Sequence, residues 1–370
     1  MLYMNYWNIN ILISLFLSIV LGRFIIPKVR SIAFYWNLLD RPDARKIHGF
    51  MVPRLGGIVF APIVAFVFFF MLGMNLRMGL TSIFDALMSD IGLFIFCFCA
   101  VMVLYVVGLA DDLVGVRYKY KFVAQIFSAI LIIGGGLYLK SFHGLLFLSN
   151  VPPLIGVPVT IFLFVFIINA MNFIDGVDGL ASGLSIVVLA VYGIAFFALE
   201  YFVFSMLTFT MLGVIIPFFY YNVFGDASSN KKIFMGDTGS QTIGLIICFL
   251  GLKLLEVVKQ NDVPEINSVM LVFSPLFLPC FDVVRVFLQR MIKRKNPFLP
   301  DCGHIHHRLI DAGFSKYSIL YLIFSISVII TICNILLTRF INVNFVIIIN
   351  VILWIGANMY LTHIIKNKKC

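Results

Sequence analysis

The sequence predicts an all-α bundle of transmembrane helices. Of the 370 residues, 62% are hydrophobic and only 12% are charged, whereas about a quarter of the residues of a typical soluble protein are charged. Apolar runs of about 20 residues, the length that crosses a bilayer core as a helix, recur along the chain without long polar stretches between them. We therefore expect residues 1–370 to form one integral membrane domain solvated by the lipid bilayer.

Eleven apolar segments are candidates for membrane spans. They cover residues 8–27, 55–74, 91–110, 122–140, 155–171, 180–199, 201–221, 239–258, 268–289, 317–338 and 343–365. The fifth segment is short, and only Glu200 marks the boundary near residue 200, so ten and twelve spans are the alternatives. The first segment has no basic residue before Arg23 and no small-residue cleavage site after it, so we expect a span there and not a secretion signal.

Basic residues predict how these spans are oriented. The 27 Lys and Arg outnumber the 17 Asp and Glu and give a net charge of +10, which in a soluble protein would suggest nucleic-acid binding. Here twenty Lys and Arg fall on one side of the eleven spans and five on the other. Because cytoplasmic loops collect basic residues, we expect an outside N-terminus, a cytoplasmic C-terminus and no nucleic-acid partner.

Acidic residues gather on the side that we expect to be cytoplasmic. Ten of the 17 Asp and Glu lie in connections there, namely Asp40, Asp43, Asp111, Asp112, Asp175, Asp178, Asp226, Asp237, Asp301 and Asp311. Ionisable groups that cluster at one membrane face between helix ends are typical of a functional site.

Two adjacent aspartates, Asp111 and Asp112, close the third expected span in the sequence GLADDLVG. Neighbouring like charges are unfavourable unless a cation lies nearby, and Mg²⁺ prefers oxygen ligands of this kind. The pair is therefore a candidate metal site. The alternative is a solvated helix end whose counter-charges are Arg117, Lys119 and Lys121.

Four amide or carboxylate side chains recur at every third position near the end of the fifth span. They are Asn169, Asn172, Asp175 and Asp178. On a continuous helix the first and the last would lie on opposite faces, but the two glycines of this motif can break the helix and let the four converge. We expect a polar pocket here, and the alternative is a pair of Asx-Gly turns between two spans.

Asp237 opens the eighth span within the sequence FMGDTGS. The small residues around it allow backbone N–H groups at a helix N-terminus to approach a phosphate group. The alternative is a simple helix cap made by Asp237 with Ser240 nearby.

A loop rich in histidine and arginine precedes the tenth span. Its His304, His306, His307 and Arg308 stand within five residues and can bind a diphosphate or a sugar. The alternative is a basic loop that contacts anionic lipid. A second basic segment, PRLGG at residues 53–57, begins the second span and can either bind an anion or merely start a helix.

Together these motifs place Asp, Asn, His and Arg on one membrane face, beside a bundle that can hold an apolar tail. The combination favours Mg²⁺-assisted phosphoryl transfer to or from a lipid. An intramembrane prenyltransferase would also use Mg²⁺ and Asp, but it gives no reason for the histidines. A secondary transporter would place its charges near the bilayer midplane, where this sequence has few.

The motifs also occur in a familiar order. PRLGG (53–57), GLADD (108–112), NFIDGVDGLASG (172–183), FMGDTGS (234–240) and HIHHRL (304–309) resemble those of the polyprenyl-phosphate N-acetylhexosamine-1-phosphate transferases, and HIHHRL resembles the WecA/TagO-like branch. The resemblance implies a phosphotransferase of the bacterial inner membrane that faces the cytoplasm and uses Mg²⁺, or alternatively Mn²⁺. It implies transfer of an N-acetylhexosamine-1-phosphate, GlcNAc-1-phosphate foremost, from a UDP-N-acetylhexosamine to undecaprenyl phosphate. UMP would leave, and a lipid-linked surface glycan would begin.

The resemblance further implies a role for each motif residue. Asp111 or Asp112 would deprotonate undecaprenyl phosphate, and Asp237 together with Asp112 would hold the metal. The residues expected to bind the nucleotide sugar are Asn172, Asp175, Asp178, Asn222, His304, His306, His307 and Arg308.

The sequence differs from many relatives at two places, and one pair of glycines bears on the oligomeric state. Many relatives have Lys where Gly49 or Phe50 stands, and a basic residue where Cys302 stands. The spacing of Gly179 and Gly183 matches a motif for close helix packing in membranes and leaves a homodimer open.

Overall fold

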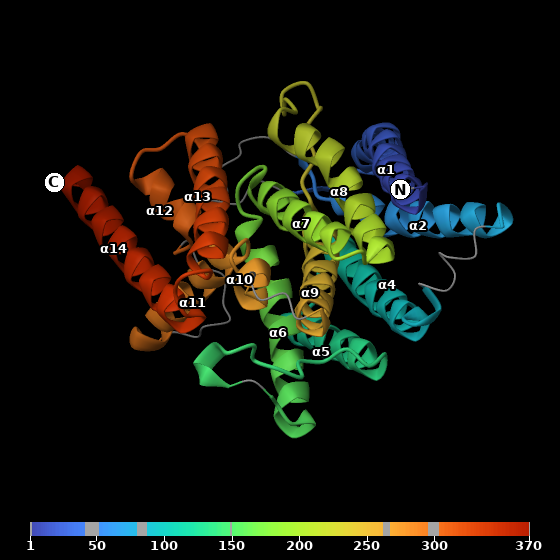
Figure 1. The fold of residues 1–370 in the computed structure, drawn as a ribbon. Helices are drawn as coiled ribbons and strands as arrows, with labels where there is room; N and C mark the ends of the chain where they lie inside the picture. Colours follow the sequence, from blue (N-terminus) through green and yellow to red (C-terminus); the bar gives the residue numbers. More distant parts are fainter. Residues whose placement is uncertain are drawn as a thin grey trace.

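The computed structural model describes residues 2–40, 52–79, 87–148, 150–261, 267–294 and 303–369, and helices dominate it (Figure 1). The longer helices are α1 (Leu2–Tyr35), α2 (Phe60–Arg77), α4 (Ile91–Val114), α5 (Tyr118–Gly134), α6 (Pro153–Ile174), α7 (Leu180–Ala198), α8 (Phe202–Val223), α9 (Gly236–Gln260), α11 (Phe277–Ile292), α13 (Lys316–Leu337) and α14 (Val343–Lys369). The shorter elements are β1 (Leu39–Asp40), β2 (Val52–Pro53), η1 (Gly56–Val59), η2 (Leu145–Phe147), α10 (Ser268–Phe273) and α12 (Ile305–Asp311). β1 and β2 pair as one small antiparallel ribbon. The expected all-α membrane bundle is confirmed.

Nine helices of the described chain are long and apolar enough to cross a membrane. They correspond to nine of the eleven expected spans. Of the other two, the segment expected at 122–140 contains α5, which has 17 residues. The segment expected at 268–289 is divided into α10 and α11, because Pro275 between them has no N–H to continue a helix. The count of eleven spans stays a prediction.

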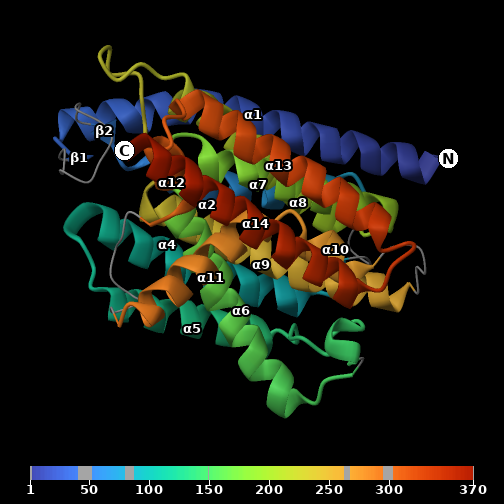
Figure 2. The same cartoon turned by 90° about the vertical axis from the view of Figure 1, so that its left-hand side faces the viewer.

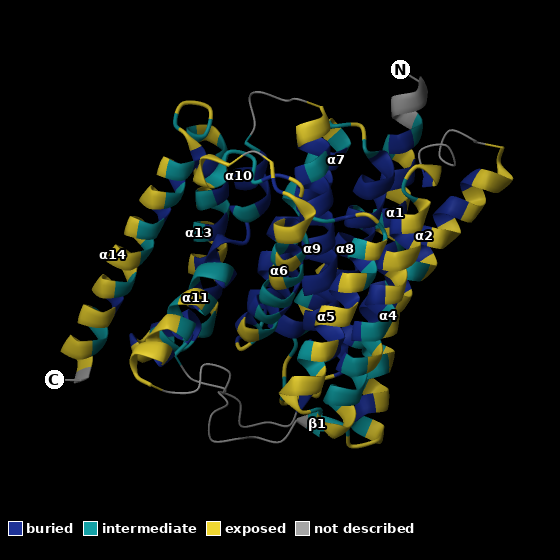
Figure 3. Ribbon diagram, turned by 90° about the horizontal axis from the view of Figure 1, so that it is seen from below, coloured by how far each residue is buried: buried dark blue, intermediate teal, exposed yellow. Residues whose placement is uncertain are grey.

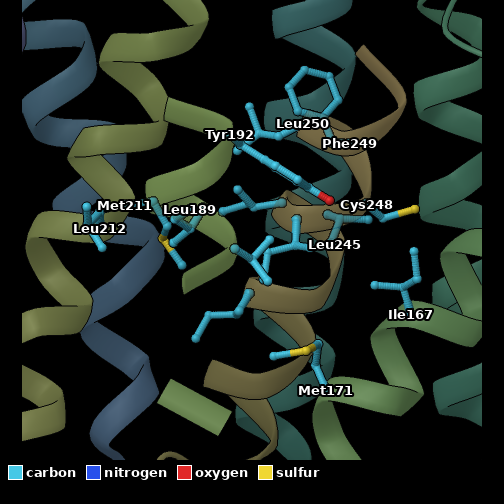
Figure 4. Packing of buried hydrophobic residues seen from close by; sticks show 14 of the residues in the cluster. Ile167, Met171, Leu189, Tyr192, Met211, Leu212, Leu245, Cys248, Phe249 and Leu250 are labelled. Carbon is cyan, nitrogen blue, oxygen red and sulfur yellow. The ribbon is translucent and has the colours of Figure 1, made fainter. Parts of the chain in front are cut away.

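α9 is the central helix of the bundle. It packs against α4, α6, α7 and α10, and 94% of its most apolar window is buried, compared with 17% for α14. Figure 4 shows Leu245 and Cys248 of α9 among Ile167 and Met171 of α6 and Tyr192 of α7. A helix enclosed in this way holds its first turn, which carries the FMGDTGS motif, in a fixed place.

Glycines bring two other motifs against the first turn of α9. A Cβ atom on Gly108 of α4 would lie 2.6 Å from Cα of Thr238, and one on Gly57 of η1 would lie 2.1 Å from Cα of Gly239. Neither distance leaves room for a side chain. The GLADD and PRLGG motifs therefore meet the FMGDTGS motif because glycine lets the backbones touch.

The segments α11 to α14 form a flank along one side of the bundle (Figures 1 and 2). α13 packs against α7 and α10, and α12 packs against α13 and α14. α14 is largely exposed in Figure 3, as expected for a lipid-facing helix, and it ends at the opposite end of the bundle from the start of α1.

The closely spaced Gly179, just before α7, and Gly183, in α7, pack within the chain. A Cβ atom on Gly179 would lie 2.2 Å from Val223 of α8, and one on Gly183 would lie 3.3 Å from Phe219 of α8. Both positions also face Leu320 of α13, at 3.3 and 3.8 Å. The motif that left a homodimer open therefore packs against this chain's own α8 and α13, and it gives no support for a dimer.

Candidate active site

Side chains from α4, α6 and α9 meet at one end of the bundle. Asp111 and Asp112 lie in the last turn of α4, Asn172 lies in the last turn of α6, and Asp237 is the second residue of α9. α4 and α6 end where α9 begins, so motifs that are far apart in the sequence converge here.

Lys121, in the first turn of α5, joins two of these carboxylates. Its Nζ donates to Asp111 Oδ2 at 3.0 Å and to Asp237 Oδ2 at 2.6 Å. Asp111 Oδ1 also accepts the backbone N–H of Val116 at 2.7 Å. Two carboxylates so close together share a proton or are neutralised by a cation. Burial and the neighbouring Asp237 raise the pKa of Asp111, and the Lys121 ammonium group places a cation beside both carboxylates.

Asp112 has a different environment, because it caps α9 from the neighbouring helix. Its Oδ1 accepts the N–H of Asp237 at 2.8 Å, and its Oδ2 accepts the N–H and the hydroxyl of Thr238 at 2.9 and 2.6 Å. An anion at a helix N-terminus is favoured by the unpaired N–H groups and by the helix dipole. Gly236 has a φ of +75°, and a Cβ there would lie 2.6 Å from Asp112 Oδ2, so glycine permits this contact.

The two asparagines of the motif near the end of α6, Asn169 and Asn172, contact different parts of the bundle. Asn172 Nδ2 donates to Asp237 Oδ1 at 3.1 Å and to Ser240 Oγ at 2.8 Å, so Asn172 belongs to the carboxylate cluster. Asn169, one turn earlier in α6, donates instead to Gln125 Oε1 of α5 at 2.7 Å. The amide of Asn172 thus fixes the side chain of Asp237, whereas Asp112 binds the backbone N–H of that residue.

Asp175 and Asp178 lie in the turn between α6 and α7. Burial raises the pKa of Asp175 well above its ordinary value, and the charges of Asp237 and Asp178 raise it further, while Arg54 opposes the shift. Asp178 Oδ2 pairs with Lys232 Nζ at 2.6 Å. Asp175 is therefore a carboxyl group suited to hold a proton, and the Arg54 of the PRLGG segment lies within its electrostatic reach.

Asn222, at the end of α8, holds this turn in place. Its Oδ1 accepts the N–H of Gly179 at 2.5 Å and its Nδ2 donates to the carbonyl of Ile233 at 2.9 Å, while the residue is 3% exposed. A contact between Asn222 and substrate stays a prediction. What the structure gives it is a positioning role for the motif that follows Asn172.

Replacing Asn222 by Ala should lower the stability of the protein. Two buried backbone groups would lose their partner, and an unsatisfied buried group costs about 1–3 kcal/mol. The midpoint of thermal unfolding in detergent would fall, whereas Asn150→Ala, at an exposed asparagine that accepts from Lys259, would leave it nearly unchanged. Equal midpoints for the two variants would contradict this role.

The histidine cluster forms the start of α12 and reaches the same turn. His304 Nδ1 lies 2.8 Å from Asp282 Oδ2 of α11, and its ring is nearly parallel to that of His306, with centroids 5.9 Å apart. A Cβ atom on Gly176 would lie 2.5 Å from His306 Nε2. The HIHHRL and NFIDG motifs therefore meet at the contact of His306 with Gly176.

His306 is buried without any hydrogen bond to the described residues. It is 1% exposed, and neither ring nitrogen has a partner. Burial lowers its pKa to about 3, and the nearby charges of His307 and His304 act in the same direction. The imidazole is neutral at physiological pH, so it can offer one donor and one acceptor to a ligand.

The buried His306 should make stability depend on pH. Below its ordinary pKa of 6.5 the unfolded chain binds a proton that the folded chain, with a pKa of about 3, does not bind. Stability then falls as the pH falls, by about 2 kcal/mol at pH 5 from this residue. His306→Phe should reduce the loss of thermal stability between pH 7.5 and pH 5, whereas the exposed His363→Phe should not. A variant that keeps the full loss would refute the assignment.

Arg308 is directed toward α14. Its guanidinium donates to the side chain and the carbonyl of Asn358 and to the hydroxyl of Thr362. These contacts direct the guanidinium to α14 and not to the carboxylate cluster. Its contacts join α12 to α14 and so position the histidines.

Three charged residues of this region were not expected in the site. The sequence suggested Lys121 only as a counter-charge, and Asp282 and Arg285 lie within the segment 268–289 that was expected to be one span. The position of Asp282 and Arg285 within an apolar segment could have identified them as site residues, because ionisable residues within membrane segments mark functional sites. The family departures at Gly49, Phe50 and Cys302 lie outside the described residues.

The fold and the site together define an enzyme that is embedded in the membrane and acts on a charged group next to the lipid. Comparison with known proteins gives the family. Residues 93–255 match Glycosyl transferase family 4. The chain is 32% identical over 331 residues to the "Probable undecaprenyl-phosphate N-acetylglucosaminyl 1-phosphate transferase" of Bacillus subtilis (strain 168), with 87% of this chain and 85% of the relative covered.

Two further relatives agree. The "Undecaprenyl-phosphate alpha-N-acetylglucosaminyl 1-phosphate transferase" of Yersinia pestis is 31% identical over 289 residues, with 78% of this chain and 73% of the relative covered. Its namesake from Escherichia coli (strain K12) is 30% identical over 308 residues, with 82% and 77% covered. This chain therefore belongs to glycosyl transferase family 4, and the resemblance suggested by the motifs is confirmed.

Proposed function

We propose that this protein transfers N-acetylglucosamine-1-phosphate from UDP-GlcNAc to undecaprenyl phosphate, releases UMP and so begins a lipid-linked surface glycan. The observation that carries the proposal is the Asp111–Lys121–Asp237 cluster, with distances of 3.0 and 2.6 Å, at the end of an apolar bundle. Charged groups for phosphate chemistry and apolar helices for a polyprenyl tail adjoin there. The relatives' names specify the same acceptor, undecaprenyl phosphate, and the same transferred group, N-acetylglucosaminyl 1-phosphate.

The carboxylates of this cluster fit Mg²⁺, with Mn²⁺ as the alternative. Asp111 and Asp237 already hold one cation, the Lys121 ammonium, between them. Mg²⁺ is usually bound by one or two carboxylates plus substrate phosphates, and within the described ranges no group of three metal-binding side chains is found. Mg²⁺ bound there would neutralise charge on the diphosphate. Asp112 was predicted as a ligand, but its oxygens accept three hydrogen bonds, so we propose Asp111 beside Asp237.

Residues of the chain divide the remaining work. The phosphate of undecaprenyl phosphate lies at the end of α4, where Lys121 binds its oxygens and either Asp112 or, if it is not bound to the metal, Asp111 accepts its proton. An oxygen of that phosphate forms a bond to the β-phosphorus of UDP-GlcNAc, and the bond between the β-phosphorus and the UMP oxygen breaks. His304, His306 and the α6–α7 turn bind the nucleotide sugar. The site faces the cytoplasm of a bacterial inner membrane, where nucleotide sugars are made.

The experiment uses the purified protein with Mg²⁺, undecaprenyl phosphate and UDP-GlcNAc labelled separately in the sugar and in uracil. Sugar that enters the organic phase with an equal amount of UMP supports the proposal. Release of UDP would mean transfer of the sugar without its phosphate and would refute the mechanism. Transfer only from a different UDP-aminosugar would keep the reaction and correct the substrate.

A further inference from the structure

Asp282 of α11 is a carboxylate buried in the apolar part of the C-terminal flank. It is 1% exposed and it has three partners in the described chain. Oδ2 accepts from His304 Nδ1 at 2.8 Å, and Oδ1 accepts from the N–H of Ile305 at 3.0 Å and from Arg285 at 2.6 Å. A buried carboxylate is costly unless every oxygen is paired, and two of the three partners of this one belong to the histidine segment.

The partners of Asp282 fix both the backbone and the side chain at the start of α12. The N–H of Ile305 is one of the first free N–H groups of that helix. Arg285 also donates to the carbonyl of Gly303 at 2.6 Å, so Asp282 and Arg285 hold the residues on both sides of His304. A cap alone would need only the contact with Ile305.

The contact with His304 has a chemical consequence for the imidazole. An ionised carboxylate only accepts hydrogen bonds, so the proton of the His304 ring must stand on Nδ1. The other nitrogen, Nε2, is then left as the acceptor of the neutral ring. In histidines that bind metals or protons, a carboxylate on one ring nitrogen sets the function of the other in this way.

His304 also lies against the motif of α6. Its ring centroid is 5.6 Å from that of Phe173, the neighbour of Asn172, and 5.9 Å from that of His306. A ring held between these two elements and fixed by Asp282 has little freedom to turn. The orientation of the imidazole is therefore set before any substrate arrives.

We propose that Asp282 is a positioning residue of the active site: it holds His304 in the Nδ1–H tautomer and presents Nε2, as a hydrogen-bond acceptor, to a hydroxyl or amide N–H of the sugar of the nucleotide donor. The proposal rests on the proposed function for the identity of that donor. Arg285 supports it by holding the carboxylate and the carbonyl of Gly303. Asp282 itself does not touch the reacting atoms.

Two variants test the proposal through the transfer assay. Asp282→Asn keeps the shape but turns an N–H toward Nδ1, which favours the opposite tautomer. We expect kcat/KM for UDP-GlcNAc to fall roughly 10- to 100-fold, as for other residues that orient a functional histidine, while the KM for undecaprenyl phosphate stays unchanged. Asp282→Glu should recover part of the loss. Asp226→Asn, at an exposed acid whose carboxylate accepts from Ser228 of its own turn, is the matched control and should behave as wild type.

A coupling measurement separates positioning from general structure. If Asp282 acts through His304, then Asp282→Asn should cost little in a His304→Gln background, because the group that it positions is already absent. A full additional loss in that background would overturn the proposal, as would equal damage to donor and acceptor parameters in the single variant.

A spectroscopic readout needs no turnover. Protein labelled with ¹⁵N in its six histidines should show His304, assigned with His304→Gln, as the Nδ1–H tautomer, and Asp282→Asn should convert it. A wild-type His304 in the Nε2–H form would refute the proposal even if no Asp282 variant folds. If wild-type protein shows this signature but transfers no sugar phosphate, the proposed function fails and the role of Asp282 toward His304 stands.

Discussion

Replacing Asp237 by Asn is expected to abolish sugar-phosphate transfer, with a loss of at least about 10²–10³-fold in kcat, which is typical for removal of one group that stabilises charge in the transition state. Its Oδ2 is within 2.6 Å of Lys121 Nζ and its Oδ1 is within 3.1 Å of Asn172 Nδ2. An amide would keep the size of the side chain but could not hold a cation between itself and Asp111. The rate of UMP release at saturating Mg²⁺ measures the effect.

The fold should survive this substitution, because Asp112 caps α9 through the backbone N–H of Asp237 and not through its side chain. The thermal unfolding midpoint of Asp237→Asn should therefore stay near that of wild type. Asp226→Asn serves again as the exposed control. Transfer at a near-normal rate by Asp237→Asn would remove Asp237 from the site and with it the proposed metal position.

Much of the fold could be predicted from the sequence because membrane helices have a strong signal. Apolar runs of sufficient length located nine helices that the structure confirms as candidate spans. The segment 268–289 shows where that signal fails. Hydropathy reads it as one span, whereas Pro275 divides it into α10 and α11, and the division lets α11 carry Asp282 toward the histidine segment.

The sequence predicted which motifs belong to the candidate site but not which partner each of their residues contacts. The motifs identified Asp111 and Asp112 as a pair, yet adjacent residues on a helix point about 100° apart. One therefore meets Lys121 of α5 and the other meets the N-terminus of α9. Which aspartate meets which partner depends on the close contact of Gly108 with Thr238, and no local sequence pattern reveals that contact.

Two acids of this protein act on helices other than their own. Asp112 of α4 caps α9 just ahead of the side chain of Asp237, and Asp282 of α11 binds the first N–H of α12 beside His304. In each case the carboxylate belongs to one motif or span and fixes the functional residue of another. The sequence does not show these contacts, because the partners are distant along the chain.

Lys121 lies between Asp111 and Asp237, where a metal ion is proposed. Its replacement should therefore have two effects, one on kcat and one on the Mg²⁺ requirement. Lys121→Met keeps the length of the stem and removes the charge. Loss of a cation that binds phosphate oxygens should lower kcat by roughly 10²-fold, the scale found for electrostatic groups of active sites. Loss of a cation that competes with Mg²⁺ for the same carboxylates should at the same time lower the half-saturating Mg²⁺ concentration.

The change in the half-saturating Mg²⁺ concentration is the more informative effect. Its sign distinguishes a lysine that competes with the metal ion from a lysine that supports the metal site. A pair of unit charges about 4 Å apart near a protein surface interacts by about 4 kcal/mol, and recovery of only about 1.4 kcal/mol of this by Mg²⁺ would lower the half-saturating concentration roughly tenfold. Titration of transfer activity with Mg²⁺ measures it, and Lys119→Met, at an exposed lysine two residues earlier, is the matched control. A higher Mg²⁺ requirement in Lys121→Met would mean that the lysine supports the metal site and does not share its place. That outcome would move the ion away from the Asp111–Asp237 pair, because an ammonium group 2.6 Å from Asp237 Oδ2 and a metal ion on the same oxygens exclude each other.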